Sequence, residues 1–272
     1  MMRSLWTAAS GMIAQQTNVD TISNNLSNVN TVGYKNESAE FKSLLYQTIQ
    51  TKSTSANSEL KPIGAQVGLG TRNSSITSHY TQGVFTSTSK STDFAIEGNG
   101  FFSVRNLDGE ILYTRNGGFN VAMAADGNIM LCTSEGFSVL DSEGNPISFP
   151  PNTDMTKVTI DDDGNICYPD ELNNPTPTGI VMGIYQFANP SGLEKMGGSL
   201  LKETAASGEA MNEAEIEGLT KSKVKQGYVE SSNVQVVDEM VNLIVAQRAY
   251  EINSKAIQAA DDMLQQANNL KK

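Results

Sequence analysis

The sequence has 272 residues, enough for one large domain or two of modest size. Hydrophobic residues make up 38% and aromatic residues 7%, which is less than a single well-filled core of this length usually contains. Part of the chain is therefore expected to be extended or to bury apolar surface only against partners. The net charge of −11 argues against nucleic acid and against an anionic membrane surface as partners.

Cys132 and Cys167 are too few for a disulfide framework and lack metal-ligand spacing, although one bridge between them stays open. No run approaches the roughly 18 apolar residues of a membrane span, so no membrane insertion is expected. The N-terminal segment has one basic residue and no continuous apolar core, which does not fit a Sec-type signal peptide. Export without a cleaved signal peptide would need another route.

The first thirty residues predict a helix that pairs with another helix. They include only two charged residues, Arg3 and Asp20, but five asparagines. Two stripes repeat every seven residues, as in a coiled coil: Leu5, Met12, Val19 and Leu26, and then Ala8, Gln15, Ile22 and Val29. A helix that only covers its own domain is the alternative, but uncharged amides favour a hydrogen-bonded interface. The many Asn and Thr residues make this helix marginal by itself.

A second helix is predicted from about Val234 to Leu270, because this stretch has neither Pro nor Gly. At that length it would extend roughly 55 Å. It carries two apolar stripes: Leu243, Tyr250, Ile257 and Leu264, and Ala249, Ala256, Met263 and Leu270, the second flanked by Val245 and Ile252. Two stripes indicate two packing directions, one toward the N-terminal helix and one toward another molecule. Arg248, Glu251 and Lys255 are spaced for pairs within the helix or for contacts with neighbours.

Short strand-like runs and turn signals fill the middle of the chain. Asp108-Gly109, Asp126-Gly127, Glu143-Gly144 and Asp163-Gly164 are separated by 18, 17 and 20 residues, which is typical of successive hairpins. Residues 51–59 predict a polar loop or extended connector. The expected fold is α+β, with paired terminal helices at 1–30 and 232–272, an extended connector at 31–75 and a β-rich domain at 76–231.

Three segments resemble the signatures of the flagellar basal-body rod and hook protein family. They are SLWTAASGMIAQQTNVDTISNNLSNVNTVGYK, then DFAIEGNGFFSV followed by YTRNGGFN, and finally GYVESSNVQVVDEMVNLIVAQRAYEINSKAIQAADDMLQQ. They occur in the family's order and bracket nearly all of the chain. One such segment would be suggestive, whereas three in register identify the chain as a member.

The resemblance implies a structural subunit whose terminal helices stack into an inner tube, with the β-rich domain outside. It implies passage through the flagellar type III export apparatus, helical polymerisation, and transmission of torque from motor to hook. The implied partners are further copies of the chain, neighbouring rod and hook proteins, the export apparatus and the bushing-ring proteins. The implied place is the flagellar basal body, crossing the periplasm or cell wall. The expected subunit-packing residues are Leu5, Met12, Val19, Ile22, Leu26, Leu243, Ala249, Tyr250, Ile252, Ala256, Ile257, Met263 and Leu264.

Two segments look like the connector of the family's distal rod members: LLYQTI at Leu44–Ile49 and PIGAQVGLGTR at Pro62–Arg72. Hook members are usually longer in the middle. The resemblance suggests that this connector stiffens the rod. Deleting residues 62–72 is then expected to leave subunits that assemble into a more bendable rod.

No catalytic residue, metal site or cofactor is predicted. The single histidine, His79, lacks a catalytic companion motif, and no G-x-S-x-G occurs. GNGFF at 98–102 predicts a tight turn entering a strand. DDDGN at 161–165 fits a hairpin turn better than a calcium loop, because its glycine is fourth and Leu172 stands at position twelve.

Two alternatives stay open at this stage. One is the hook or another rod subunit of the same family, which complementation of strains lacking each component would distinguish. The other, from a different class, is a secreted β-domain binding module whose terminal helices merely cap the fold. That module would have protease-resistant, highly helical ends as a dilute monomer.

Overall fold

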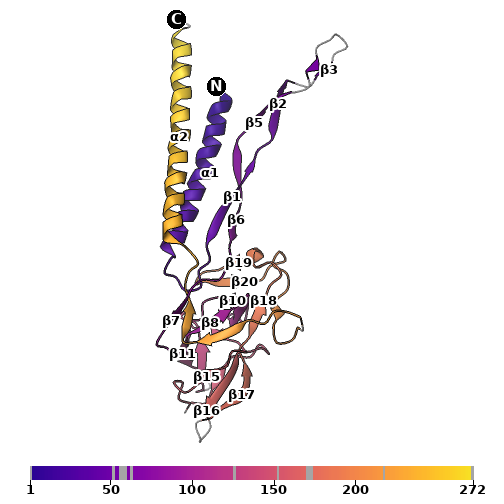
Figure 1. Ribbon diagram of the computed structural model, residues 1–272, viewed down its shortest axis with the longest axis vertical. Coiled ribbons are helices and arrows are strands. Elements are labelled where there is room, and N and C mark those ends of the chain that lie inside the picture. The colour runs from indigo at the N-terminus through magenta and orange to yellow at the C-terminus, as the bar shows by residue number, and fades with distance from the viewer. Residues whose placement is uncertain are drawn as a thin grey trace. The chain divides into compact units, whose positions relative to one another are not determined.

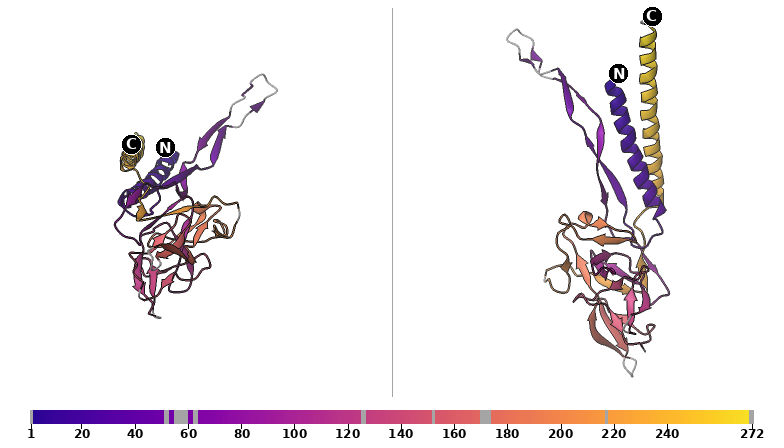
Figure 2. Two further views of the ribbon diagram at one scale, coloured as in Figure 1. Left: turned by 60° about the horizontal axis from the view of Figure 1, so that its bottom comes forward. Right: turned by 180° about the vertical axis from the view of Figure 1, so that it is seen from behind.

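The computed structural model describes residues 2–50, 53–54, 60–61, 64–124, 127–151, 153–169, 174–216 and 218–270. They belong to two compact units (Figures 1 and 2). The helical unit comprises Met1–Ser27, Glu37–Ser78 and Gln235–Lys272, and the β-rich unit comprises Asn28–Asn36 and His79–Val234. The predicted α+β fold class is confirmed, whereas the roles expected for segments 31–75 and 76–231 remain predictions.

The helical unit contains the two predicted terminal helices, α1 (Met2–Ser27) and α2 (Val236–Asn269). They lie side by side and antiparallel (Figure 1). Asp238 and Glu239 lie in the first turn of α2, where negative charge stabilises the helix dipole. The heptad pattern of the sequence extends to Val29, beyond the end of α1 at Ser27. Neither helix combines the length and apolar character of a membrane span over the described residues.

The rest of the helical unit is a long two-stranded antiparallel ribbon that leads out along one strand and back along the other (Figure 2). Its pairs are β1 with β6, β2 with β5 and β3 with β4. The strands are β1 (Glu37–Ser43), β2 (Tyr46–Gln50), β3 (Ser53–Thr54), β4 (Leu60–Lys61), β5 (Ala65–Gly68) and β6 (Thr71–Ser78). Most of the polar loop expected at 51–59, together with Pro62 and Ile63, lies outside the described residues.

The β-rich unit is built on a ten-stranded sheet with the main order β11-β12-β13-β9-β10-β20-β19. Strand β14 pairs with β12, and β18 pairs with both β9 and β21. The strands of this sheet are β9 (Phe101–Arg105), β10 (Ile111–Thr114), β11 (Asn120–Met123), β12 (Ile129–Cys132), β13 (Ser138–Val139), β14 (Ser148–Phe149), β18 (Ile184–Gln186), β19 (Glu194–Lys195), β20 (Leu200–Lys202) and β21 (Met211–Asn212).

Three smaller sheets complete the β-rich unit. Strands β15, β16 and β17 form one, β22 pairs with β8, and β23 pairs with β7. A short 3-10 helix, η1 (Pro190–Gly192), precedes β19. The strands are β7 (Phe85–Ser87), β8 (Phe94–Glu97), β15 (Thr159–Ile160), β16 (Asn165–Pro169), β17 (Pro175–Val181), β22 (Lys223–Gln226) and β23 (Tyr228–Glu230). The last two strands therefore return to pair with the first two of the unit.

The predicted turns fall between paired strands. Gly109 lies between β9 and β10, and Gly164 lies between β15 and β16, both with positive φ as such turns require. The hairpin interpretation of DDDGN is therefore confirmed. Gly144 also has positive φ, and its N–H donates to Asp141. Asp126 lies outside the described residues, while β11 and β12 on either side of it pair as expected.

Large apolar side chains fill the β-rich unit in two clusters. The larger one contains Phe94, Phe102 and Phe119, whose rings pack edge-on or tilted against one another. The smaller one joins Phe101 of β9, Tyr113 of β10 and Leu201 of β20 with Phe187 and Leu193. Adjacent residues of β9 thus point into different clusters, because successive side chains of a strand face opposite sides.

Candidate assembly surfaces

The side of α2 that faces α1 is a line of small and polar residues. Glu239, Ala246, Asn253 and Ala260 follow one another every seven residues, and all except Asn253 are buried. Asn253 lies against Gly11 of α1, where an added Cβ would come within 2.9 Å of the Asn253 side-chain nitrogen. Small residues at this seam permit close packing of the two helices. Hydrophobic patterning missed this line, and its only signal in the sequence was the spacing of seven.

The five residues predicted on α1 are all at least half-buried. Ile22 is buried. The other four are half-buried: Leu5, Met12, Val19 and Leu26. Their role in packing between subunits remains a prediction.

The eight residues predicted on α2 divide into two sets. Leu243, Ala249 and Ile257 are half-buried. The other five are exposed: Tyr250, Ile252, Ala256, Met263 and Leu264. The structure therefore does not bring all eight residues to one surface. The whole last stretch of α2, residues 261–270, is exposed.

An outward face of α2 carries a row of exposed β-branched residues. They are Val237, Val241, Ile244, Val245 and Ile252. Helix geometry places Val237, Val241 and Ile244 opposite the Glu239–Ala260 line and Val245 and Ile252 beside them. Ile252, for example, is 66% exposed. A contiguous apolar row left in water on a long helix indicates an interaction surface.

α1 also presents large apolar residues to solvent. Trp6 is the only tryptophan of the chain and is 75% exposed, and Ile13, seven residues later, is also exposed. Neither belongs to the predicted packing set. Their spacing of seven places them on one side of the helix and was the signal available in the sequence.

A Ser/Thr side of α1 holds the ribbon. The backbone N–H of Thr71 donates to Ser10 Oγ at 3.3 Å, and the Asn73 side-chain nitrogen donates to Thr17 Oγ1 at 2.5 Å. Next to these contacts, a Cβ added at Gly70 would lie 2.1 Å from Ser10 Oγ. The ribbon approaches the helix so closely only because residue 70 has no side chain.

One buried amide connects three elements of the helical unit. Asn25 is 1% exposed. Its Oδ1 accepts the Glu37 N–H at 3.0 Å, and its Nδ2 donates to the Glu37 carbonyl at 2.8 Å and to Glu239 Oε2 at 3.3 Å. Asn25 thereby ties the end of α1 to the start of β1 and to the first turn of α2. A buried polar contact of this kind favours one register of the helix pair over others.

The ribbon itself exposes apolar side chains away from its contacts with α1. Leu45 is 84% exposed. Further exposed apolar residues of the ribbon are Phe41, Tyr46, Ile49, Val67, Leu69 and Ile76. A thin two-stranded ribbon cannot bury these side chains within itself, because it has no second layer.

Several residues were weighed for other chemistry. His79 is exposed. Residues 98–100 form a bend before β9, with Gly98 at positive φ, which confirms a tight turn entering a strand. Cys132 and Cys167 are both free thiols. Across the described residues, His, Cys, Asp and Glu side chains form no group of three that could hold a metal ion.

Together these features define a class of protein: a structural α+β subunit whose terminal helices keep apolar faces for other molecules. Comparison with known protein families agrees. The family described as flagella basal body rod protein matches residues 5–35, and the flagellar hook protein FlgE/F/G D1 domain matches residues 95–168. The flagellar basal body rod FlgEFG protein C-terminal family matches residues 225–270.

Similar proteins are found over the full length of the chain. The flagellar basal-body rod protein FlgG of Borreliella burgdorferi is 48% identical, with 100% of both chains covered. FlgG of Buchnera aphidicola subsp. Acyrthosiphon pisum is 42% identical, covering 99% of this chain and 100% of the relative. FlgG of Agrobacterium fabrum is 42% identical, covering 96% of this chain and 97% of the relative. The chain belongs to the flagellar basal-body rod protein family and is a structural subunit of the distal rod.

Proposed function

We propose that the chain polymerises through its terminal helices into a helical rod that transmits torque from motor to hook. The observation that carries this proposal is the outward face of α2, a row of β-branched residues exposed opposite the α1-facing line. A helix with two packing sides needs a neighbour on each side, and α1 covers only one side of α2. A head-to-tail contact between successive subunits that does not close into a ring repeats along an axis, so it builds a filament. The predicted subunit-packing residues of α1 and α2 belong to these contacts.

In this proposal the paired helices, residues 1–30 and 232–272, form the inner tube, and residues 76–231 form the outer domain. The 31–75 segment is a stiffening connector between neighbouring molecules. The exposed Leu45, Tyr46 and Leu69 support that role, since they lie on a ribbon with no layer of its own to cover them. Neighbouring subunits supply the missing cover on assembly.

The remaining partners follow from the family. They are neighbouring rod and hook proteins, the type III export apparatus and, where an outer membrane is present, the bushing-ring proteins. The rod crosses the periplasm or cell wall. Passage of an unfolded chain is favoured by helices whose shared seam buries mostly alanine, because such helices are marginal until neighbours pack on them. The role is structural and non-enzymatic.

Electron microscopy of polymer grown from the purified chain tests this function. The double variant Val241→Ser/Ile252→Ser removes apolar surface from the outward face of α2, and Gln247→Ala is the matched control on an exposed polar position of the same helix. We expect rods from the wild type and the control, and soluble monomers with an unchanged fold from the double variant. Rods of normal length from the double variant would contradict the proposal. Complementation of strains lacking the hook or each rod subunit tests the distal position.

A further inference from the structure

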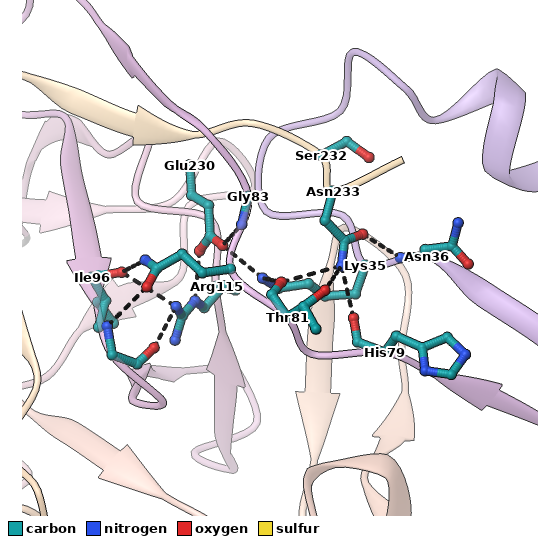
Figure 3. A network of polar contacts seen from close by, with 12 residues as sticks. Lys35, Asn36, His79, Thr81, Gly83, Ile96, Arg115, Glu230, Ser232 and Asn233 are labelled. Carbon is teal, nitrogen blue, oxygen red and sulfur yellow. Dashed lines mark hydrogen bonds and ion pairs between the residues drawn. The ribbon is translucent and has the colours of Figure 1, made fainter. Parts of the chain in front are cut away.

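The chain passes repeatedly between its two units, and three of the passages share one polar cluster. The β-rich unit includes Asn28–Asn36 and His79–Val234, so the chain leaves it after Asn36, returns at His79 and leaves again after Val234. Figure 3 shows the Asn233 side chain directed at the backbone of Asn36, His79 and Thr81, which come from the other two places. We call residues 35–36, 79–81 and 230–234 the exit cluster.

The side chain of Asn233 binds both other segments of the exit cluster. Its Oδ1 accepts the backbone N–H of Asn36 at 2.7 Å. Its Nδ2 donates to the carbonyl of His79 at 2.9 Å, and to Oγ1 and the carbonyl of Thr81 at 2.9 and 3.1 Å. The His79 N–H in turn donates to the Asn36 carbonyl at 2.8 Å. Only an amide side chain offers an acceptor and two donors in this arrangement.

A buried ion triad lies beside Asn233 and anchors the cluster to the β-rich unit (Figure 3). Glu230 accepts from Lys35 Nζ and from Arg115 Nε, both at 2.6 Å, and all three side chains are buried. Lys35 Nζ also donates to the Thr81 carbonyl at 2.8 Å. Arg115 continues to the carbonyls of Ile96, Gly98 and Gly100, which lie at the ends of β8 and β9.

Asn233 and the triad have different exposure, which separates their roles. The triad is buried and its charges pair with one another, so its loss affects the fold of the unit. Asn233 is only half-buried and its contacts are mostly with backbone groups of other segments. Removing its amide deletes four hydrogen bonds between the segments, while the backbone bond from His79 to Asn36 and the contacts of Lys35 with Thr81 and Glu230 remain.

We infer that Asn233 is a positioning residue that joins the three exit segments, so that force passing between the units is shared by all three. Three segments crosslinked at one point bend less than three that move independently, because their hydrogen bonds are loaded together. This inference rests on the proposed function, since a rod that transmits torque needs a stiff junction between its inner tube and its outer domain. It adds a specific residue to that function, outside the helices and the ribbon.

The test compares Asn233→Ala and Asn233→Asp with Ser232→Ala in the full chain. The aspartate keeps the acceptor for Asn36 but replaces the donor group with oxygen facing two carbonyls. Ser232 is the matched control, because its hydroxyl accepts only from the nearby Val234 N–H among its described bonds. Thermal unfolding of each monomer verifies that the β-rich unit is folded.

Two measurements then decide the inference. In the monomer, we expect hydrogen exchange at the Asn36 amide to accelerate about tenfold in Asn233→Ala, which removes the acceptor of this amide, and to stay near the wild-type rate in Asn233→Asp, which keeps it. In the polymer, we expect rods that form normally but have a shorter bending persistence length than wild-type and Ser232→Ala rods.

The contradicting outcomes are distinct. Unchanged exchange in Asn233→Ala would show that Asn233 does not hold the segments. Faster exchange with unchanged rod stiffness would show that the joint carries no force. A wild-type chain that forms no rods would contradict the proposed function itself, and this inference with it.

Discussion

The described part of the β-rich unit buries large side chains such as Phe101, Phe102 and Phe119 in two clusters. In the helical unit, by contrast, the buried apolar residues among those described are four alanines and Ile22. The larger apolar residues of that unit, including Trp6, Leu45 and Ile252, remain in water. Apolar burial is the main stabilising contribution to folding, so the β-rich unit has more of this stabilisation within the single chain than the helical unit has.

The comparison also separates two ways of using polar residues. The β-rich unit buries a charged triad around Glu230, with Lys35 and Arg115 as partners. The helical unit relies mainly on uncharged groups, such as Asn25, which donates to the buried Glu239, and Ser10 at the ribbon. Buried charges must all be paired before the unit is stable, whereas hydroxyl and amide contacts can form and break with little cost in water.

The largest expected effect comes from removing an aromatic ring from the core of the β-rich unit. Phe102→Ala deletes a fully buried ring that packs against Phe119, and we expect a loss of about 3–5 kcal/mol in the free energy of unfolding. Ile244→Ala on α2 is the contrasting variant, with an expected change within about 0.5 kcal/mol in the monomer. Urea unfolding measures both. Equal losses would mean that α2 is already covered in the monomer.

A smaller loss is expected when the buried triad is broken. Glu230→Gln leaves Lys35 and Arg115 without their counter-charge, at an expected cost of about 3 kcal/mol at neutral pH. Burial alone raises the pKa of the Glu230 carboxyl, but Arg115, Lys35 and hydrogen bonds from Lys35 and Gly83 outweigh burial and hold the pKa below its ordinary value.

The lowered pKa of Glu230 determines how the loss in Glu230→Gln depends on pH. A carboxyl with a lowered pKa in the folded state stabilises the fold above its ordinary pKa of 4.5, and this contribution disappears as pH falls through the folded-state value. The gap between wild type and Glu230→Gln in unfolding free energy should therefore narrow below pH 4.5. A gap that stays constant in acid would show that Glu230 is not charged in the folded protein.

An intermediate effect is expected at the contact between ribbon and helix. Gly70→Ala places a methyl group 2.1 Å from Ser10 Oγ at a residue with φ of 116°, and we expect a loss of about 1–3 kcal/mol in the helical unit. Gly68→Ala is the control, because its nearest neighbour is the Tyr46 ring at 3.4 Å. Hydrogen exchange along β1 and β6 reports the difference. Equal exchange in the two variants would mean that the ribbon does not lie on α1 in solution.

The smallest effect is expected at an ion pair on the surface of the β-rich unit. Glu110 and Lys202 approach to 2.6 Å, as close as the members of the buried triad, but their side chains are 41% and 40% exposed. Solvent screens such a pair, so Glu110→Gln should leave the urea midpoint unchanged. A shift as large as that of Glu230→Gln would show that distance rather than burial decides the strength of these pairs.

Much of this architecture was predictable from local patterns. The absence of Pro and Gly between Val234 and Leu270 predicted α2, and the Asp-Gly turns predicted hairpins such as that at Gly109. These features depend on residues close together in the chain, where backbone preferences act directly. The same holds for the outward stripe of α2, whose residues Val245 and Ile252 were visible at their spacing.

The α1-facing side of α2 was not predictable in the same way. Glu239, Ala246, Asn253 and Ala260 resemble a polar surface, and only the nearness of Gly11 and Asn25 makes them an interior. The exit cluster and its ion triad were likewise invisible, since the triad joins Lys35, Arg115 and Glu230 from distant parts of the sequence.

By itself, the sequence determined the terminal helices, the hairpins of the middle and the family, because each of these is written in short-range periodicity or in contiguous segments. Tertiary structure alone decided which face of α2 is covered, where the ribbon lies on α1 and how Asn233 ties three segments together. The reason is that burial and hydrogen bonding depend on which residues meet in space. A Ser, Asn or Ala can lie either in an interior or on a surface, and only its spatial neighbours decide which.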